Sequence, residues 1–502
     1  MIENKRLNSI DSFRAMPPKN SSIRCVNLLR LLTDRELRAF GKFMDSPLFK
    51  VGKQQHALLK YLLKSAPDYE EALLEKPVIH RKLFGAKTPY NEKTIRDLLS
   101  DLALLLEEFI AIERVRRDKV LRKQLLAEET TKHPDRVFLY RELTSLERAI
   151  DRKPNRSTAY YREKFRLQKI KTSHPLDDTL RNRRDALDEA AEALQRSVAL
   201  EKARLLLQLK NRRKALGTPY SMTTEAATLD YLRENTADVA CHLYLLLLEN
   251  IDTPDLERTQ QIFALYSERA DAFSYKELID ISALAGNACT RLYKSHSAEA
   301  IELANRMNLF TLQSIFTRSE EATISPNRIR NIYGHAVHAG TASAIVDAIR
   351  AIYEERNFNS EEHLDNLNFI LAHYNLSIGE LDVAYQKIAL VNLNNPDLGI
   401  HGRILQIRLY FELFDKDRDR YSALLESALD SYSKYIRRYD KSSLQHTVEK
   451  DTIASCLRDL YSVKKNRKGS KALLKQLETK VPQITSKVIR SWIERQIESV
   501  QT

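Results

Sequence analysis

The chain has 502 residues and a net charge of +13, with 43% hydrophobic residues, 11 Gly and 14 Pro. Proteins made of strands and tight turns need more glycine and proline than this, so the shortage argues against them. Abundant Leu, Ala, Arg, Glu and Lys are good helix formers, and we therefore predict an all-α protein.

Two observations bear on where the protein works. The first residues contain no continuous apolar run, and the most apolar stretch, 243–248, is far too short to span a membrane. We therefore expect no secretory signal and no membrane span. Four scattered cysteines without paired spacing predict buried, reduced thiols in a cytoplasmic protein, not disulfides or a zinc site. They are Cys25, Cys241, Cys289 and Cys456.

The positive charge is unevenly distributed. Lys/Arg exceed Asp/Glu by 29 to 21 in residues 1–150, by 18 to 9 in 151–215 and by 15 to 7 in 437–502. Residues 216–436 are acidic, with 19 Lys/Arg against 31 Asp/Glu. Most such charge is solvated helix surface. The alternatives are contact between the basic parts and nucleic acid, or pairing with a charged protein partner.

The N-terminal part is predicted to contain a disordered tail, 1–22, followed by a helical bundle, 23–119. Thr33 and Glu36 are spaced as a capping box at the start of a helix. After "TPYN", apolar residues recur in steps of three and four, which places them on one stripe of a single helix. They are Ile95, Leu98, Leu102, Leu105, Phe109 and Ile112.

Residues 120–217 are predicted to form a basic helical region. The stretch "RSTAYYREKFRLQKIKTSHP" combines Tyr160, Tyr161 and Phe165 with six Lys/Arg. Aromatic and basic side chains in alternation can stack bases and follow phosphates. Their near-helical spacing also suits packing against neighbouring helices, and both interpretations stay open. One or two long amphipathic helices follow and end near Gly217.

Residues 218–436 are predicted to form a solenoid of antiparallel helix pairs. In "LAHYNLSIGELDVAYQKIALVNLNNP", counting from Asp365 puts Ala372 at position eight, Gly379 at fifteen, Ala384 at twenty and Pro396 at thirty-two. This is close to the tetratricopeptide pattern of 34-residue units. Small alanines let the two helices cross closely, glycine permits the turn, and proline ends the second helix.

This segment departs from the tetratricopeptide pattern at two positions, and further helix pairs are predicted on either side of it. Asn368 and Asn375 replace the usual Trp and Tyr of the repeat. Another pair is predicted around Gly340, and a further one follows residue 398. Because no single pair buries its apolar face, such pairs stack into a superhelix. We expect residues 437–502 to form basic helices that cap the array.

These segments also resemble a known family. "LTDRELRAFGKFMDSPLF", "YNEKTIRDLLSDLALLLEEF" and "NLNFILAHYNLSIGELDVAYQKI" are similar to segments of uncharacterised, tetratricopeptide-like helical proteins common in Bacteroidota. The resemblance covers about residues 28–438. The family carries no assigned activity and no assigned catalytic residues. What the resemblance implies is a tetratricopeptide-like fold in a bacterial cytoplasm.

Motifs that carry common chemistries are absent from the sequence. It contains no GxxxxGK[ST] or GxGxxG phosphate loop, no GxSxG elbow and no HExxH. His335 and His338 are three residues apart without a nearby third ligand, which favours ordinary packing or surface histidines over a metal site. We predict no catalytic residue, no metal and no cofactor. An enzyme whose site is assembled from distant residues stays an alternative.

The leading functional hypothesis is a non-enzymatic scaffold that holds a protein or peptide partner in a superhelical groove. The alternatives are a nucleic-acid-associated protein that makes weak, nonspecific phosphate contacts through its basic ends, and an enzyme of unrecognised type. In tetratricopeptide arrays, positions five, nine and twelve of each first helix face the groove. These positions are Phe369, His373, Leu376, Arg403, Ile407 and Tyr410.

This predicted groove is apolar and aromatic, with one cation. It favours an extended or helical segment with apolar anchors, and its acidic surroundings favour basic flanks. The alternative is that the six side chains pack against the next repeat or the C-terminal helices.

Overall fold

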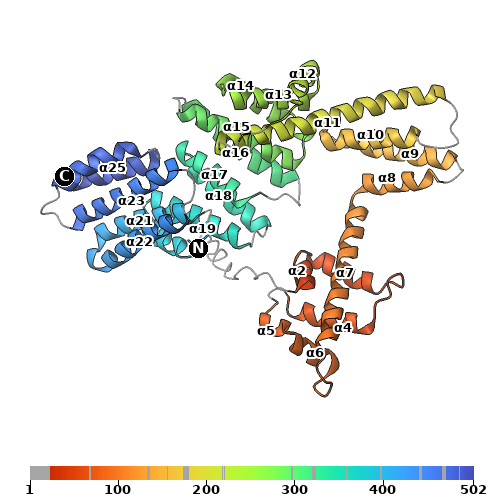
Figure 1. The fold of residues 1–502 in the computed structure, drawn as a ribbon, viewed down its shortest axis with the longest axis horizontal. Coiled ribbons are helices and arrows are strands. Elements are labelled where there is room, and N and C mark those ends of the chain that lie inside the picture. The colour runs from red at the N-terminus through yellow and green to blue at the C-terminus, as the bar shows by residue number, and fades with distance from the viewer. Residues whose placement is uncertain are drawn as a thin grey trace, which may run out of the picture. The chain divides into compact units, whose positions relative to one another are not determined.

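The chain folds into two compact units in this computed structural model (Figure 1). One comprises Met1–Leu248 with Asp271–Ser274, and the other comprises Glu249–Ala270 with Tyr275–Thr502. The structure describes 23–66, 69–132, 136–154, 156–172, 180–216, 219, 221–294, 298–318, 324–356, 360–395, 398–439, 444–465, 471–484 and 487–501. Every regular element in these ranges is a helix, so the all-α prediction is confirmed for the described residues.

The described residues of the first unit form twelve α-helices, the last of which continues past the unit boundary, and most of a short 3-10 helix. They are α2 (Arg24–Arg30), α3 (Asp34–Met44), α4 (Lys53–Lys64), α5 (Glu71–Leu74), α6 (Lys76–Phe84), α7 (Glu92–Arg117), α8 (Lys119–Thr130), α9 (Arg136–Asp151), α10 (Thr158–Thr172), α11 (Leu180–Leu216), α12 (Glu225–Glu234), α13 (Val239–Asp252) and η1 (Ala270–Ala272).

Helices α2 to α7 share one apolar core. The predicted stripe on α7 lies in it, with Ile95 and Leu102 fully buried and Phe109 nearly so. The predicted capping box is present at the start of α3: the Thr33 hydroxyl accepts from the Glu36 N–H at 3.3 Å, and the Glu36 carboxylate accepts from the Thr33 N–H at 2.7 Å. Local sequence signals therefore determine both helices.

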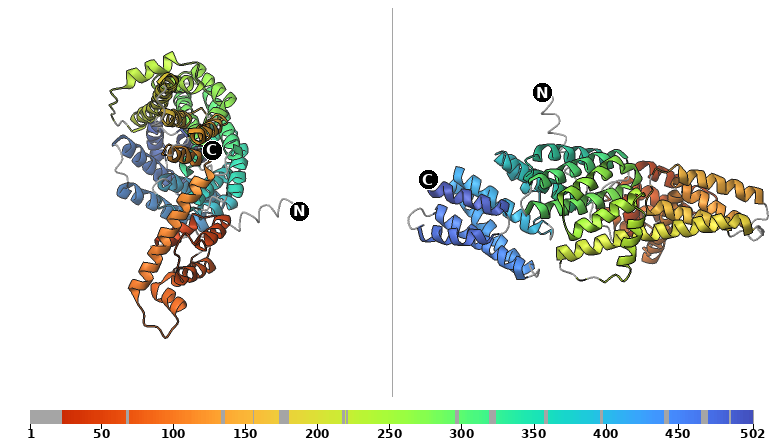
Figure 2. Two further views of the ribbon diagram at one scale, coloured as in Figure 1. Left: turned by 90° about the vertical axis from the view of Figure 1, so that its right-hand side faces the viewer. Right: turned by 90° about the horizontal axis from the view of Figure 1, so that it is seen from above.

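A second apolar core lies among α8, α9 and α10, and α11 packs along α10. Figure 2 shows α11, in yellow, running beside α10. Its 37 residues form one continuous helix, where the sequence allowed one or two. At about 1.5 Å per residue it is about 55 Å long.

The second unit contains the remaining α-helices and a 3-10 helix. They are α14 (Leu256–Glu268), α15 (Tyr275–Lys294), α16 (Ala298–Arg318), α17 (Pro326–His338), α18 (Ala342–Arg356), α19 (Glu361–Ser377), α20 (Leu381–Ile388), α21 (Gly399–Lys416), α22 (Arg418–Tyr439), α23 (Leu444–Lys465), α24 (Lys471–Lys480), η2 (Val481–Gln483) and α25 (Lys487–Gln501).

Helices in this unit pack as neighbouring pairs, chiefly α15 with α16, α19 with α20 and α21 with α22. Gly379 has φ +83° between α19 and α20, and the following N–H, of Glu380, donates back to the Asn375 carbonyl at 2.9 Å. Only glycine adopts such a φ without strain, so the predicted turn is confirmed. Ala372 and Ala384 are 1% and 0% exposed, as a close crossing of the two helices requires.

Several sequence predictions stay open. The predicted tail, 1–22, and Pro396 lie outside the described residues. The boundary between the two units falls at 248/249, inside α13, and does not test the five-part division predicted from the sequence. All four cysteines are buried and none forms a disulfide. Among the described helices, none has the length and apolar character needed to cross a membrane.

Candidate functional site

The six residues of the predicted groove lie on α19 and α21, which pack against each other. Four of them are at most 8% exposed, and His373 and Leu376 are half-buried. This burial agrees with the alternative that the side chains pack inside the unit. A binding role for the set stays a prediction. The buried four are Phe369, Arg403, Ile407 and Tyr410.

His373 belongs to the packing between helices. Its Nδ1 lies 2.9 Å from the hydroxyl of Tyr333 on α17, and the two rings meet edge to face. Burial lowers the pKa of His373 to about 4, and the positive charge of Arg408 lowers it further. His373 is therefore neutral at pH 7, and its contact with Tyr333 joins α17 to α19.

Arg403 has a different environment from the other five residues of the predicted groove. Its Nε donates to the Ser431 hydroxyl at 3.2 Å and its Nη1 to the Gly399 carbonyl at 3.0 Å and to the Leu393 carbonyl. The guanidinium lies 4.2 Å from the centre of the Tyr435 ring. A Cβ on Gly399 would collide with the Tyr435 hydroxyl, so glycine is needed there for this stacking. Arg403 is thus fixed between the start of α21 and α22.

Arg403 also lines a pocket of about 1060 Å³ along α22, and it is the one residue of the predicted groove that does so. Most of the lining comes from successive turns of α22 on one face of the helix. The lining residues are Asn394, Arg403, Ala423, Glu426, Ser427, Asp430, Ser431, Lys434, Tyr435, Arg437 and Arg438.

The acidic side chains of the pocket are already paired. Glu426 accepts from Lys465 at 2.6 Å and from the Tyr461 hydroxyl at 2.6 Å. These two contacts hold the pKa of Glu426 below its usual range. Asp430 forms an ion pair with Arg458 at 3.0 Å. Both carboxylates therefore have a cation beside them.

The basic side chains of α22 are not paired in this way. Lys434, Arg437 and Arg438 are exposed, and none forms an ion pair with another described residue. Together with Arg403 they give the C-terminal half of the pocket a positive charge that its own carboxylates do not balance. Such a site is suited to an anionic group.

The sequence contains a signal for this cluster that the groove prediction did not use. Ser427, Ser431, Lys434 and Arg438 follow each other in steps of four, three and four, which places them on one helix face. The predicted boundary at 436/437 divides the run "SKYIRR" between an acidic and a basic segment. Counting charge by segment therefore concealed a cluster that lies across the border.

The basic and aromatic stretch on α10 is largely engaged within the first unit. Its Lys164 and Lys171 form ion pairs with Asp151 and Glu147 at 2.6 and 3.1 Å, and its Glu163 pairs with Lys153 at 2.8 Å. Its tyrosines likewise contact neighbouring charged side chains. The packing interpretation thus accounts for these side chains.

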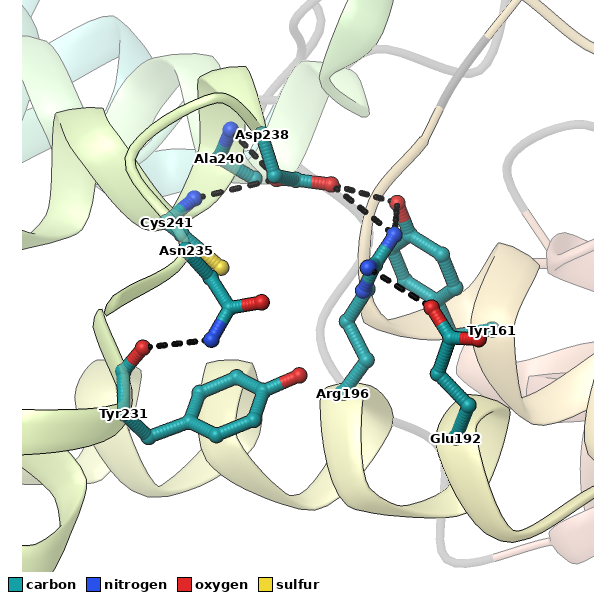
Figure 3. A network of polar contacts seen from close by, with 8 residues as sticks. All are labelled: Tyr161, Glu192, Arg196, Tyr231, Asn235, Asp238, Ala240 and Cys241. Atoms are coloured by element: carbon teal, nitrogen blue, oxygen red, sulfur yellow. Dashed lines mark hydrogen bonds and ion pairs between the residues drawn. The ribbon is translucent and has the colours of Figure 1, made fainter. Parts of the chain in front are cut away.

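Figure 3 shows the tyrosine–arginine contact that joins α10, α11 and the start of α13. The Tyr161 hydroxyl donates to Asp238 at 2.5 Å, and Arg196 donates to Tyr161 at 3.3 Å and to Glu192 at 2.9 Å. The other Asp238 oxygen accepts the N–H groups of two residues in the first turn of α13. Burial and the Asp238 carboxylate raise the pKa of Tyr161. The hydrogen bonds of Tyr161 and Asp238 thus link α10, α11 and the start of α13.

His335, one of the two histidines weighed as a metal ligand, is also engaged. Its Nε2 lies 2.9 Å from the Thr290 hydroxyl and its Nδ1 lies 2.9 Å from the Asn308 amide. Burial, with help from the charge of Arg328, lowers its pKa to about 4. His338 lies beside Tyr293, with the ring centres 5.6 Å apart and the ring planes tilted by 48°.

Comparisons with protein-family models, with curated proteins and with solved structures gave no match to this chain.

Proposed function

We propose that the protein is a non-enzymatic scaffold whose helix pairs form a tetratricopeptide-like array, and that it binds an acidic segment of a protein partner along α22. The positive φ of Gly379 and the buried Ala372 and Ala384 support the repeat. The family resemblance stated from the sequence, and a cytoplasmic location, are part of the same proposal.

The proposed binding site rests on one observation, which is how the charges in the pocket are paired. Its two carboxylates are held by Lys465 and Arg458, whereas three cations of α22 point to solvent without an ion pair to a described residue. Arg and Lys bind carboxylates through charge-assisted hydrogen bonds that are stronger than neutral ones. The pocket therefore favours an acidic partner, whereas the acidic sequence around the predicted groove favoured a partner with basic flanks.

A peptide suits this pocket better than a nucleic acid. The lining spans Ala423 to Arg438, which is about 22 Å of helix at about 1.5 Å per residue. Glu426 and Asp430 lie at its N-terminal half, where the evenly spaced phosphates of a nucleic acid would meet them. A peptide can place acidic residues beside the cations and polar or basic residues beside the carboxylates.

A direct binding measurement tests this proposal. A fluorescent 12-residue peptide rich in Glu is titrated with the protein and with its Lys434→Glu/Arg438→Glu variant, and anisotropy is recorded. We expect at least a tenfold loss of affinity in the variant, about 1.4 kcal/mol. The matched control is Arg162→Glu/Arg166→Glu on α10, which has the same spacing and the same change of charge at two exposed positions.

Two outcomes would overturn the proposal. Equal losses in the two variants would mean that only net charge matters. The nucleic-acid alternative would be favoured if the protein bound a DNA or RNA oligonucleotide more tightly than the peptide, and if the α10 variant lost that binding.

A further inference from the structure

The long helix α11 carries an uncovered row of apolar side chains. Leu187, Leu194, Val198 and Leu205 are 55%, 43%, 41% and 48% exposed, and Ala191 between them is exposed as well. Isolated exposed leucines are common on protein surfaces, but these five share one helix face over about 27 Å. We call this row the α11 stripe.

The stripe lies opposite the face that packs on α10. At about 100° per residue, its five members fall within about 40° of one line along the helix. Buried Leu200 and Leu207 and the Arg196 contact of Figure 3 lie on the other side. The helix therefore has two apolar faces, of which the fold covers one.

Four of the five stripe residues are spaced symmetrically about position 196, while the fifth, Ala191, has the charged Glu201 at its mirror position. Leu187 and Leu205 lie nine residues before and after position 196, and Leu194 and Val198 lie two residues before and after it. An antiparallel copy of the same helix would place Leu187 against Leu205 and Leu194 against Val198. A two-fold interface requires this kind of self-complementary pattern.

Polar residues at one edge of the stripe are spaced symmetrically about position 195, one residue from the centre of the apolar pairs. Asp188, Gln195 and Lys202 are spaced by seven residues along this edge. In the antiparallel arrangement, Asp188 would lie beside Lys202 of the second copy, and Gln195 beside Gln195 of the second copy. Asp188 and Lys202 form no ion pair with a residue that the structure describes. Opposite charges at such flanking positions set the partner and the orientation of paired helices.

A hollow lies at the C-terminal end of the stripe. It has a volume of about 440 Å³, and its lining includes Leu205, Leu209 and Met222. The symmetric register brings Leu187 of the second copy to this end. The hollow, whose lining also includes Gln208 and Arg212, gives the leucine a place to insert, as a knob enters a hole between paired helices.

We propose that two copies of the chain associate through the α11 stripe, antiparallel, with a two-fold axis close to residue 196. The apolar spacing, the Asp188–Lys202 complementarity and the hollow beside Leu205 are the observations that support this partner and this register. The inference is independent of the binding site on α22.

Sedimentation of the full chain tests the association. We expect a monomer–dimer equilibrium for the wild type and at least tenfold weaker association for Leu194→Glu. Leu104→Glu, at an exposed leucine on α7, is the matched control and should associate like the wild type. Asp188→Lys should weaken the dimer by placing like charges together, and Asp188→Lys/Lys202→Asp should restore it.

Cross-linking tests the register. All four native cysteines are buried, so an introduced cysteine is the accessible thiol among the described residues. Under mild oxidation, Gln195→Cys should form a disulfide between two copies, whereas Asp188→Cys should not, because its equivalents lie about 24 Å apart along the helix axis. A mixture of Asp188→Cys and Lys202→Cys chains should cross-link to each other.

Any of three results would overturn the proposal. A wild-type chain that stays monomeric at 100 µM contradicts the association. Efficient self-cross-linking of Asp188→Cys, or a dimer that Leu194→Glu leaves unchanged, contradicts the antiparallel stripe.

Discussion

Helices α11 and α22 each bury one face and present the other to solvent, but the exposed faces differ in kind. Helix α11 belongs to a segment with twice as many Lys/Arg as Asp/Glu, 18 against 9, yet its outward face carries an apolar stripe. Helix α22 lies almost wholly in the acidic segment, yet cations line its pocket. The net charge of a segment does not show which charges are available, because ion pairs formed in the fold remove many of them.

The largest expected effect is on the free energy of unfolding. It distinguishes Arg403, which is fixed by hydrogen bonds in the α22 pocket, from the exposed cations of the same pocket. Arg403→Ala leaves the Leu393 and Gly399 carbonyls without their guanidinium donor and opens a gap beside Tyr435. We expect a loss of about 2–4 kcal/mol in the free energy of unfolding. Arg438→Ala should change it by less than about 0.5 kcal/mol. Chemical denaturation measures both, and similar losses would show that Arg403 is an ordinary surface residue.

The buried histidines extend the comparison to groups that are uncharged at neutral pH. Burial lowers the pKa of both His335 and His373 to about 4, from an unfolded value of about 6.5. Their contribution to stability is complete above pH 6.5 and is lost as the pH falls toward 4, because the unfolded chain then binds the protons first. We expect protonation of each histidine to lower the free energy of unfolding by about 2 kcal/mol over this pH range. This is less than the full pKa shift implies, because both rings are half-buried.

Ring-proton chemical shifts of these two histidines check the expectation by NMR. Titration midpoints near pH 4 support it. Midpoints near 6.5 would mean that the rings are solvated and contribute nothing to acid sensitivity.

A smaller effect concerns the network that orients α11. Tyr161→Phe removes the hydroxyl that donates to Asp238 and keeps the ring, while the other Asp238 oxygen still accepts from the first turn of α13. We expect a loss of about 1 kcal/mol in unfolding free energy. The matched control, Tyr160→Phe, removes a longer and more exposed bond of 3.2 Å to Asp151 and should cost less. A larger loss in the control would contradict the structural role of the network.

Local signals allowed much of the fold to be predicted. The capping box at Thr33, the α7 stripe and the turn at Gly379 depend on residues close in sequence, and each was predicted where the structure has it. The candidate site was harder, because exposure depends on neighbours distant in sequence. Arg403 was predicted as part of a groove, but its stacking on Tyr435 and the pairing of Glu426 with Lys465 join α21, α22 and α23. No spacing within one helix shows those contacts.

The most direct test of the account uses a photo-cross-linking amino acid at one position on each helix, Ser427 on α22 or Leu194 on α11, with the Glu-rich peptide present. We expect the probe at Ser427 to capture the peptide, and the probe at Leu194 to capture a second copy of the chain. Capture of the peptide at Leu194 and not at Ser427 would contradict the assignment of the acidic partner to α22.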